Sequence, residues 1–361
     1  MAKFEGVQWA PCQMQYLLGA ENGSILPSDA TSYTVSRSLH YGLFLVFEGI
    51  RFFVRPKGSA LELCLMNWDK NLARFCRGMS YSLSQEQGQN MPQEADLERI
   101  FLQFFRQPSL RPFLERMANT QAQGYFRPYT LDEDQSIGVT FPGSPSIRAA
   151  ICSYERYLGE PFEGVVIPHL VRAVSVNQTG SLKLGTNYLI SVKAVEEAQR
   201  IVPQAAAALF LDDAVHLPLR DRNITEWDSS CCLFALRDGS LIKIPEGPLI
   251  LPSVTIRGIV GLARARGITV VERHLTYGEL LDLVEQKELV AVCSLGTAGI
   301  LNRCQKLHLI DENRRVIAVH EGDTSHALFK QIADLRLEYW ELYKNDEPAP
   351  DGLKRFRYDI P

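Results

Sequence analysis

The chain has 361 residues, which is too long for one minimal domain and fits two packed domains. Hydrophobic residues make up 46% and charged residues 22%, as in ordinary globular proteins, so the composition excludes a disordered chain. The formal net charge of −4 leaves no basic excess for nucleic-acid binding, and no apolar run is long enough to span a membrane. We therefore expect a cytoplasmic protein with neither nucleic acid nor membrane as a partner.

The cysteines are scattered along the chain, and three of them lie inside apolar runs: Cys64, Cys152 and Cys293. This pattern is typical of buried reduced thiols and not of disulfides. Cys231 and Cys232 are adjacent, without CxxC spacing, and the histidines show no HxxxH pattern. We expect no metal site.

In the first half of the chain, alternating apolar residues predict a strand over 43–54, which a turn at 56–59 interrupts. A helix is predicted from about Asn67. Residues 85–93 are polar and rich in glutamine, and they predict a surface loop.

The second half has clearer patterns. Asp238 and Gly239 form the turn of a predicted hairpin over 234–243, and Gly267 is a suitable C-terminal cap for the helix before it. Apolar spacing predicts helices over 187–201 and 255–266, and strands over 165–167, 171–176, 205–211, 270–274 and 289–295.

Strands and helices are mixed without strict alternation, so the predicted fold class is α/β, in the mixed α+β sense. A boundary near residue 160 gives a small N-terminal α/β domain over 1–160 and a larger C-terminal domain over 161–361.

The first candidate for chemistry is the stretch 181–188, Ser-Leu-Lys-Leu-Gly-Thr-Asn-Tyr, which places Lys183 just before a predicted helix. The glycine after it lets another group approach closely. Lysines in general become Schiff-base nucleophiles when desolvation or nearby positive charge lowers their pKa. Taken alone, this pattern is more often a solvated lysine at a helix start.

Further motifs accompany the lysine stretch in a fixed order along the chain. They read His40-Tyr41-Gly42, Phe47-Glu48-Gly49-Ile50-Arg51, Tyr125-Phe126-Arg127-Pro128, Ile224-Thr225-Glu226, Leu251-Pro252-Ser253-Val254-Thr255 and Ser294-Leu295-Gly296-Thr297-Ala298. Together with the lysine stretch, they resemble the branched-chain aminotransferase family, from about residue 15 to about residue 335.

The resemblance implies a pyridoxal 5'-phosphate (PLP) enzyme of fold-type IV, with a small α/β domain, a larger domain with a β-barrel-like core, and the cofactor between them. Lys183, carried by the larger domain, would form the internal aldimine and move the catalytic proton. Glu226 would keep the ring nitrogen protonated, and Tyr188 would lie near the phenolic oxygen. For Glu226 the alternative is a solvated acid beside a strand end.

The resemblance assigns the remaining positions to the cofactor phosphate and to the substrate. It implies Val254, Thr255, Gly296 and Thr297 for the phosphate, Thr297 and Ala298 for the substrate α-carboxylate, and Tyr41, Phe47, Tyr125 and Arg127 for the rest of the substrate. Core packing for the aromatic residues and a structural ion pair for Arg127 stay open as alternatives.

The implied activity is transfer of an amino group between an L-amino acid and a 2-oxo acid by a homodimer. The amino acid would be glutamate or a branched-chain or other hydrophobic one. One alternative is a lyase of the same fold, resembling aminodeoxychorismate lyase. Another is a non-catalytic relative that has lost the cofactor.

The sequence departs from the family pattern at three places. Asn71 stands where the family has a phosphate-binding arginine, which leaves Lys70 or Arg74 as substitutes. The segment 227–232 lacks the usual asparagine and begins with the bulky Trp227, which we expect to narrow the pocket. Arg257 is displaced by one position. These changes predict an altered grip on the cofactor and an unusual substrate.

Overall fold

The computed structural model describes residues 4–31, 35–158, 161–172 and 179–361. Within it, the chain divides into two compact units. What we call the first unit comprises Phe4–Glu155, Leu182–Thr186 and Lys354–Pro361, and the second unit comprises Arg156–Ser181 and Asn187–Leu353. These bounds differ from a single split at residue 160 in three segments of the described chain, 156–158, 182–186 and 354–361, and Lys183 lies in the second of these, among residues of the first unit.

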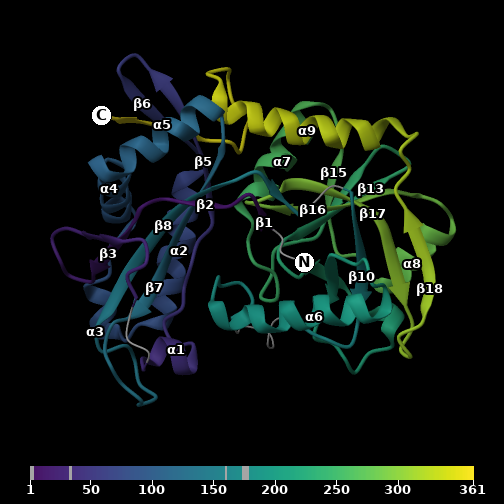
Figure 1. Ribbon diagram of the computed structural model, residues 1–361. Helices are drawn as coiled ribbons and strands as arrows, with labels where there is room; N and C mark the ends of the chain where they lie inside the picture. The colour runs from purple at the N-terminus through teal and green to yellow at the C-terminus, as the bar shows by residue number, and fades with distance from the viewer. Residues whose placement is uncertain (1–3, 32–34, 159–160, 173–178) are drawn as a thin grey trace. The chain divides into compact units, whose positions relative to one another are not determined.

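The first unit is built on an antiparallel sheet in the strand order β19-β6-β5-β7-β8-β3-β4, with β2 beside β8 (Figure 1). Its strands are β1 (Phe4–Glu5), β2 (Gln8–Trp9), β3 (Cys12–Leu17), β4 (Ser24–Pro27), β5 (Ile50–Lys57), β6 (Ala60–Met66), β7 (Gln123–Asp132), β8 (Pro145–Tyr154) and β19 (Arg355–Ile360). Its helices are α1 (Arg37–Tyr41), α2 (Trp68–Ser82), α3 (Gln85–Gln89), α4 (Glu94–Phe105), the 3₁₀ helix Pro108–Leu110 and α5 (Arg111–Thr120).

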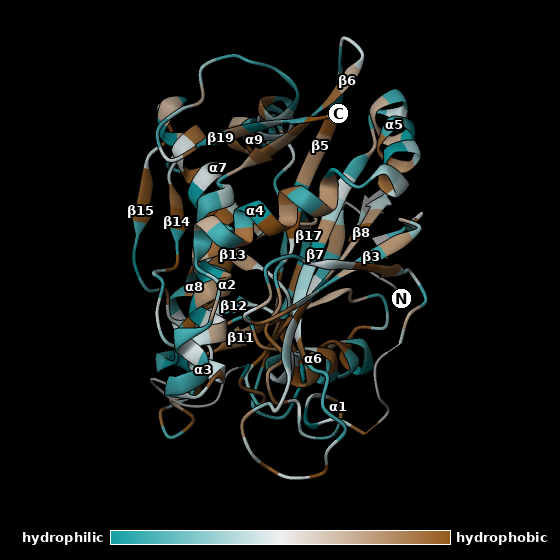
Figure 2. Ribbon diagram, turned by 90° about the vertical axis from the view of Figure 1, so that its left-hand side faces the viewer, coloured by the Kyte–Doolittle hydropathy of each residue, from teal (hydrophilic) through white to brown (hydrophobic). Residues whose placement is uncertain are grey.

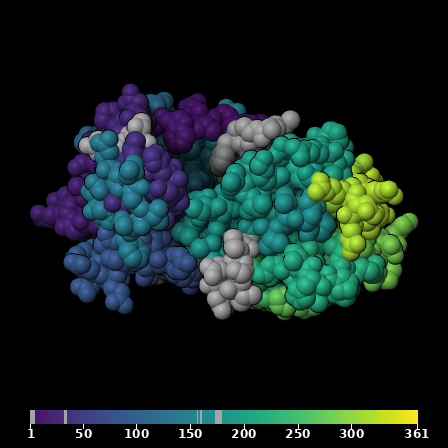
Figure 3. Space-filling view, turned by 90° about the horizontal axis from the view of Figure 1, so that it is seen from below, coloured from purple at the N-terminus to yellow at the C-terminus, as the bar shows by residue number. Residues whose placement is uncertain are grey.

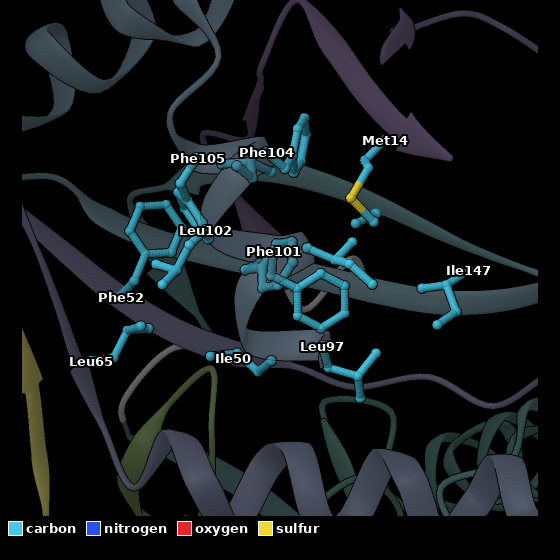
Figure 4. Close-up of a cluster of buried hydrophobic side chains, with 14 of the residues drawn as sticks. Met14, Ile50, Phe52, Leu65, Leu97, Phe101, Leu102, Phe104, Phe105 and Ile147 are labelled. Carbon is cyan, nitrogen blue, oxygen red and sulfur yellow. The ribbon is translucent and has the colours of Figure 1, made fainter. Parts of the chain in front are cut away.

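Aromatic side chains from β5, β7 and α4 pack together with aliphatic ones in the core of this unit (Figure 4). Phe126 of β7 is fully buried, with ring centres 5.0 Å from Phe101 and 5.1 Å from Phe105, and Phe52 lies 5.2 Å from Phe105. Each such burial contributes about 1.5–3 kcal/mol. The Phe52 ring packs directly on Gly124, two residues before Phe126, in space that the Cβ of any other residue would occupy. One face of β7 is therefore committed to packing against the helices.

The second unit is built on a mixed sheet in the order β12-β11-β10-β17-β16-β13-β14-β15, with β18 beside β17. Its strands are β9 (Arg156–Tyr157), β10 (Phe162–Ile167), β11 (Ala207–Leu211), β12 (Ile224–Trp227), β13 (Cys231–Leu236), β14 (Leu241–Lys243), β15 (Val270–Glu272), β16 (Leu289–Gly296), β17 (Ile300–Ile310) and β18 (Val316–Glu321). Its helices are α6 (Tyr188–Ile201), which follows the 3₁₀ turn Gly185–Asn187, the 3₁₀ helix Leu219–Asp221, α7 (Val254–Ala265), α8 (Tyr277–Glu285) and α9 (Ala327–Lys344).

Helix α6 covers β10 and β11 through Ala194 and Ala198, which pack on Val165 and Phe210. Its opposite side forms part of the surface of the second unit in Figure 3. In Figure 2 the apolar residues concentrate along the strands, whereas polar residues are frequent in helices and loops, as burial of the sheets requires. Within the described parts of the chain, no helix combines the length and apolar character needed to cross a bilayer.

The mixed α/β class is confirmed, and so are most predicted elements of the second half. The helices at 187–201 and 255–266 correspond to α6 and α7, and Gly267 follows α7 with φ +76°. The hairpin is present as the β13–β14 pair, with Gly239 at φ +90°. All eight cysteines are buried free thiols, as predicted.

Two predictions for the first half are wrong. Residues 85–89 form helix α3 instead of a loop, because the hydroxyl of Ser84 and the side chain of Gln87 make a reciprocal capping box. The strand expected from residue 43 begins at Ile50.

The strand predicted over 171–176 falls partly on 173–178, outside the described residues.

Candidate functional site

A cavity lies on the face of the first-unit sheet that points away from the aromatic core. Side chains alternate along a strand, so Tyr125, Arg127 and Tyr129 point opposite to Phe126. Together with neighbouring residues they line a cavity of about 570 Å³. The other lining residues are Val7, Trp9, Leu45, Val46, Phe47, Cys152 and Gly185.

Lys183 is placed beside this cavity by backbone pairing with the segment before β5. The Phe47 amide donates to the Lys183 carbonyl over 3.1 Å, and the Gly185 amide donates to the Leu45 carbonyl over 2.7 Å. This pairing brings the Lys183 side chain to Phe47, with Nζ 4.8 Å from the ring centre. The sequence-predicted lysine and Phe47 are thus brought together.

Arg127 is held by aromatic side chains. Its Nη2 donates to the Tyr125 hydroxyl over 2.6 Å, and its Cζ lies 4.6 Å from the Phe47 ring centre and 5.1 Å from that of Tyr125. Cation–π contacts of this kind stabilise a partly desolvated guanidinium. Cys152, also on the cavity wall, is a neutral thiol, because burial raises its pKa to about 11 although Arg127 pulls the pKa down.

Tyr41 does not line this cavity. It ends the short helix α1, is 45% exposed, and its hydroxyl donates to the Ile137 carbonyl over 2.9 Å. Of the expected substrate residues, the structure therefore brings Phe47, Tyr125 and Arg127 together around the cavity and leaves Tyr41 apart from it.

In the second unit, Glu226 of β12 is a buried carboxylate with a buried cationic partner. Its Oε1 lies 2.7 Å from Nη1 of Arg172 and accepts from the Leu251 amide over 3.1 Å. Cζ of Arg172 also lies 5.9 Å from the ring centre of Tyr188. Burial disfavours the charge of Arg172, but Glu226 and Tyr188 outweigh it and raise the Arg172 pKa. The solvated-acid alternative for Glu226 is wrong.

Helix α7 begins in the same unit and presents backbone amides. Ser253 caps it by accepting from the Ile256 amide over 3.3 Å, which leaves the first amides, of Val254 and Thr255, without acceptors inside the helix. The positive end of a helix dipole favours a phosphate group there. Gly296 ends β16, and Thr297 and Ala298 follow it in the turn before β17.

These groups fit the needs of PLP, which are a lysine, a carboxylate for the ring nitrogen and anion-binding groups for the phosphate. Lys183, Glu226 and the start of α7 are of the required types. The Nε atom of Arg172 is buried without a hydrogen-bond acceptor in the described structure. A buried donor of this kind is costly unless a ligand supplies an acceptor.

Asn71, at the first departure from the family pattern, binds the buried carboxylate of Glu48 inside the first unit. Nδ2 of Asn71 donates to Glu48 over 3.0 Å, and Nε and Nη2 of Arg74 bind the same carboxylate over 2.6 and 2.8 Å. Glu48 and Arg74 are both buried, so Arg74 already has a strong partner. Lys70 is exposed.

At the second departure, the expectation that Trp227 narrows a pocket is wrong. The side chain is 1% exposed, its Nε1 donates to the Cys293 carbonyl over 3.1 Å, and its ring lies 5.4 Å from that of Phe162. Gly164 lies under the indole, where a Cβ would come within 2.5 Å of the ring. Trp227 therefore packs inside the second unit. The displaced Arg257 forms an ion pair with Glu246.

Sequence reasoning missed Arg172, Trp9 and Cys152. Arg172 lies in a predicted strand, where nothing marks it as the partner of Glu226. Trp9 and Cys152 join the cavity through strand pairing, since Trp9 lies opposite Cys152 and Cys152 lies opposite Tyr125. Only the observation that Cys152 lies in an apolar run signalled part of this group.

Comparison with known proteins gives the following similarities. No protein-family model matches the chain. The chain is 25% identical to branched-chain-amino-acid transaminase 1 of Bacillus subtilis over 308 residues, which are 84% of this chain and 80% of that protein. The branched-chain aminotransferase of Thermoproteus uzoniensis, solved with norvaline, superposes with a TM-score of 0.68 at 19% identity, covering 95% of this chain and 99% of that one. The branched-chain amino acid aminotransferase of Thermobaculum terrenum, solved in its PLP form, gives a TM-score of 0.66 at 17% identity, covering 96% and 99%.

The chain thus has the fold-type IV architecture, and this part of the expectation is confirmed. The resemblance to the branched-chain aminotransferase family is confirmed as well, at low sequence identity.

Proposed function

We propose that the protein is a PLP-dependent aminotransferase that moves an amino group between an L-amino acid and a 2-oxo acid. The observation that carries this proposal is the position of Lys183, whose ammonium lies against Phe47 beside a cavity that also holds Arg127. The similarity to named branched-chain aminotransferases, one of them solved with PLP, supports the same reaction.

When bound, PLP supplies an electron sink that weakens the bonds at Cα of an amino acid. Lys183 holds the cofactor through Nζ, and the same amine accepts and returns the proton at substrate Cα. Glu226 keeps a proton on the ring nitrogen, and Arg172 fixes the orientation of that carboxylate through a 2.7 Å ion pair. Tyr188 lies beside the Arg172 guanidinium and is proposed for the phenolic oxygen of the cofactor.

The remaining assignments concern anionic groups. The amides of Val254 and Thr255 and the turn at Gly296 and Thr297 bind the phosphate, because a helix start and turn amides are suited to anions. Thr297 and Ala298 receive the substrate α-carboxylate. Arg127, a cation in an otherwise largely apolar cavity, receives a side-chain carboxylate when glutamate is the donor.

We further propose a cytoplasmic homodimer in which each chain is built from the two compact units. In the first unit, the loop between β7 and β8 exposes apolar side chains, with Ile137 73%, Val139 70% and Phe141 57% exposed. Apolar residues grouped on a surface loop are typical of an interaction site, and a second copy of the chain would cover them.

The test is an absorption spectrum of the purified protein with added PLP, followed by addition of L-glutamate. We expect a yellow, lysine-dependent band that is lost in Lys183→Ala and that glutamate converts to the pyridoxamine form. Lys193→Ala removes an exposed lysine on α6 that has no proposed role in the site, so it is the matched control and should keep the band. Unchanged turnover in Lys183→Ala contradicts the assignment.

Two other results would point to the alternatives that the sequence left open. A stable band that glutamate does not change favours a lyase of this fold. Absence of any band at saturating PLP favours a non-catalytic relative, in which Asn71 and Arg74 serve only Glu48.

A further inference from the structure

The cavity of the first unit is lined by rings along a row that crosses several strands. Strand pairing places Trp9 opposite Cys152, Cys152 opposite Tyr125, and Phe47 opposite Tyr129. Paired residues in neighbouring strands point to the same side of a sheet. Tyr129, Arg127 and Tyr125 follow at alternate positions of β7, so the lining runs diagonally across the strands, from Phe47 next to Lys183 to Trp9 on β2.

The length of this row exceeds the reach of a small aliphatic side chain. From the Phe47 segment through β7 and β8 to β2 there are three strand spacings, or about 14 Å, and the four residues from Tyr129 to Tyr125 add an offset of about 13 Å along β7. The cavity of about 570 Å³ lies within the range of roughly 300–1,000 Å³ that holds drug-sized ligands. A branched side chain such as that of valine or leucine would fill only the part nearest Lys183.

The chemistry of the wall favours a flat aromatic occupant. Phe47, Tyr125, Tyr129 and Trp9 present rings, and the Cys152 thiol is neutral because burial raises its pKa. Aromatic pairs in offset or edge-to-face contact stabilise a complex beyond the apolar area that they bury, which a ligand without a ring does not gain. Trp9 is 62% exposed, so a ligand ring that packs on it removes a large apolar area from water.

We infer that the amino donor is an L-amino acid with a large aromatic side chain and that Trp9 is a specificity-determining residue. This inference rests on the proposed function and goes further by naming the substrate class. Tyr125 and Phe47 hold the near part of the side chain, and Trp9 holds its far end.

The experiment compares tryptophan, phenylalanine and valine as donors to 2-oxoglutarate, using holoenzyme with saturating PLP. We expect wild type to prefer the aromatic donors. In Trp9→Ala the ratio of kcat/KM for tryptophan to that for valine should fall about tenfold, mainly through KM, and Trp9→Phe should restore most of it. Leu17→Ala removes an exposed apolar side chain from β3 of the same sheet, outside the cavity, and is the matched control.

A calorimetric titration with 3-phenylpropionate, which has no amino group to transfer, tests the aromatic binding site separately from the aminotransferase activity. Weaker binding in Trp9→Ala than in Leu17→Ala supports the aromatic site even if no donor is turned over, in which case only the aminotransferase proposal fails. Preference of wild type for valine, or equal binding by Trp9→Ala and wild type, overturns the inference. A change of oligomeric state in Trp9→Ala would also overturn it, by assigning Trp9 to an interface.

Discussion

The buried ion pair between Arg172 and Glu226 can be tested by a double-mutant cycle. The two charged groups are 2.7 Å apart, and their side chains are 3% and 2% exposed. Arg172→Met leaves the Glu226 carboxylate buried without its cation, which is expected to lower the free energy of unfolding by about 3–5 kcal/mol. Glu226→Gln leaves the guanidinium uncompensated and should have a cost of similar size.

The double variant removes both charges, so it should cost clearly less than the sum of the single variants. We expect a coupling energy of about 2 kcal/mol or more, within the range of contacting residues. The assay is urea unfolding followed by circular dichroism without added cofactor, so that ligand binding does not enter.

The matched control is the Arg266–Glu338 pair, at 3.0 Å with side chains 64% and 28% exposed. Exposed pairs contribute about 0–1 kcal/mol, so this cycle should show little coupling. If the effects of Arg172→Met and Glu226→Gln add up, or couple no more than the control, the buried pair is not formed.

Three further predictions concern stability. Arg74→Met leaves Glu48 buried without its cation and should lower the free energy of unfolding in urea by about 3–5 kcal/mol. Gly164→Ala places a Cβ against the Trp227 ring and should cost about 1–3 kcal/mol in the same assay. His320 is buried with Nε2 unpartnered, and burial lowers its pKa from 6.5 to about 4. The unfolded chain therefore takes up a proton between these pH values, so stability that is present above pH 6.5 is lost toward pH 4, by about 3 kcal/mol, and His320→Leu should remove this dependence.

Each of these changes has a control on the same molecule. Arg116→Met, on the surface of α5, should cost far less than Arg74→Met. Gly138→Ala, where a Cβ meets nothing within 4 Å, is the reference for Gly164→Ala, and equal effects would contradict the close approach to Trp227. For His320, an unchanged slope of stability against pH in His320→Leu would contradict a neutral buried imidazole.

Elements with strong periodicity or clear end signals could be predicted from the sequence. Helix α7 has an apolar stripe and Gly267 just after its end, and the structure has it at Val254–Ala265, one residue from the predicted 255–266. Helix α3 was missed because its residues are polar and only the reciprocal bonds of Ser84 and Gln87 stabilise its start. Such a local cap is hard to distinguish from a loop by hydrophobicity.

Site residues that belong to short sequence motifs could be predicted. Site residues that meet only through the pairing of distant strands could not. Lys183, Phe47 and Arg127 belong to motifs, and the structure brings them to one cavity. Trp9 and Cys152 are more than one hundred residues apart and meet only through the β2–β8 register. No local pattern encodes that pairing, because register depends on which faces the whole sheet buries.

Strand β7 shows why stability and specificity are coupled in this protein. Phe126 packs into the aromatic core, whereas Tyr125 and Arg127, its immediate neighbours, face the cavity. A slip by one residue would exchange the two faces, burying Arg127 among phenylalanines and exposing Phe126. The lack of a Cβ at Gly124, where Phe52 fills the space, fixes the register against this slip. Substitutions at the cavity-facing positions of β7 can therefore change the lining of the cavity without disturbing the core. This holds only while core packing keeps the strand in register.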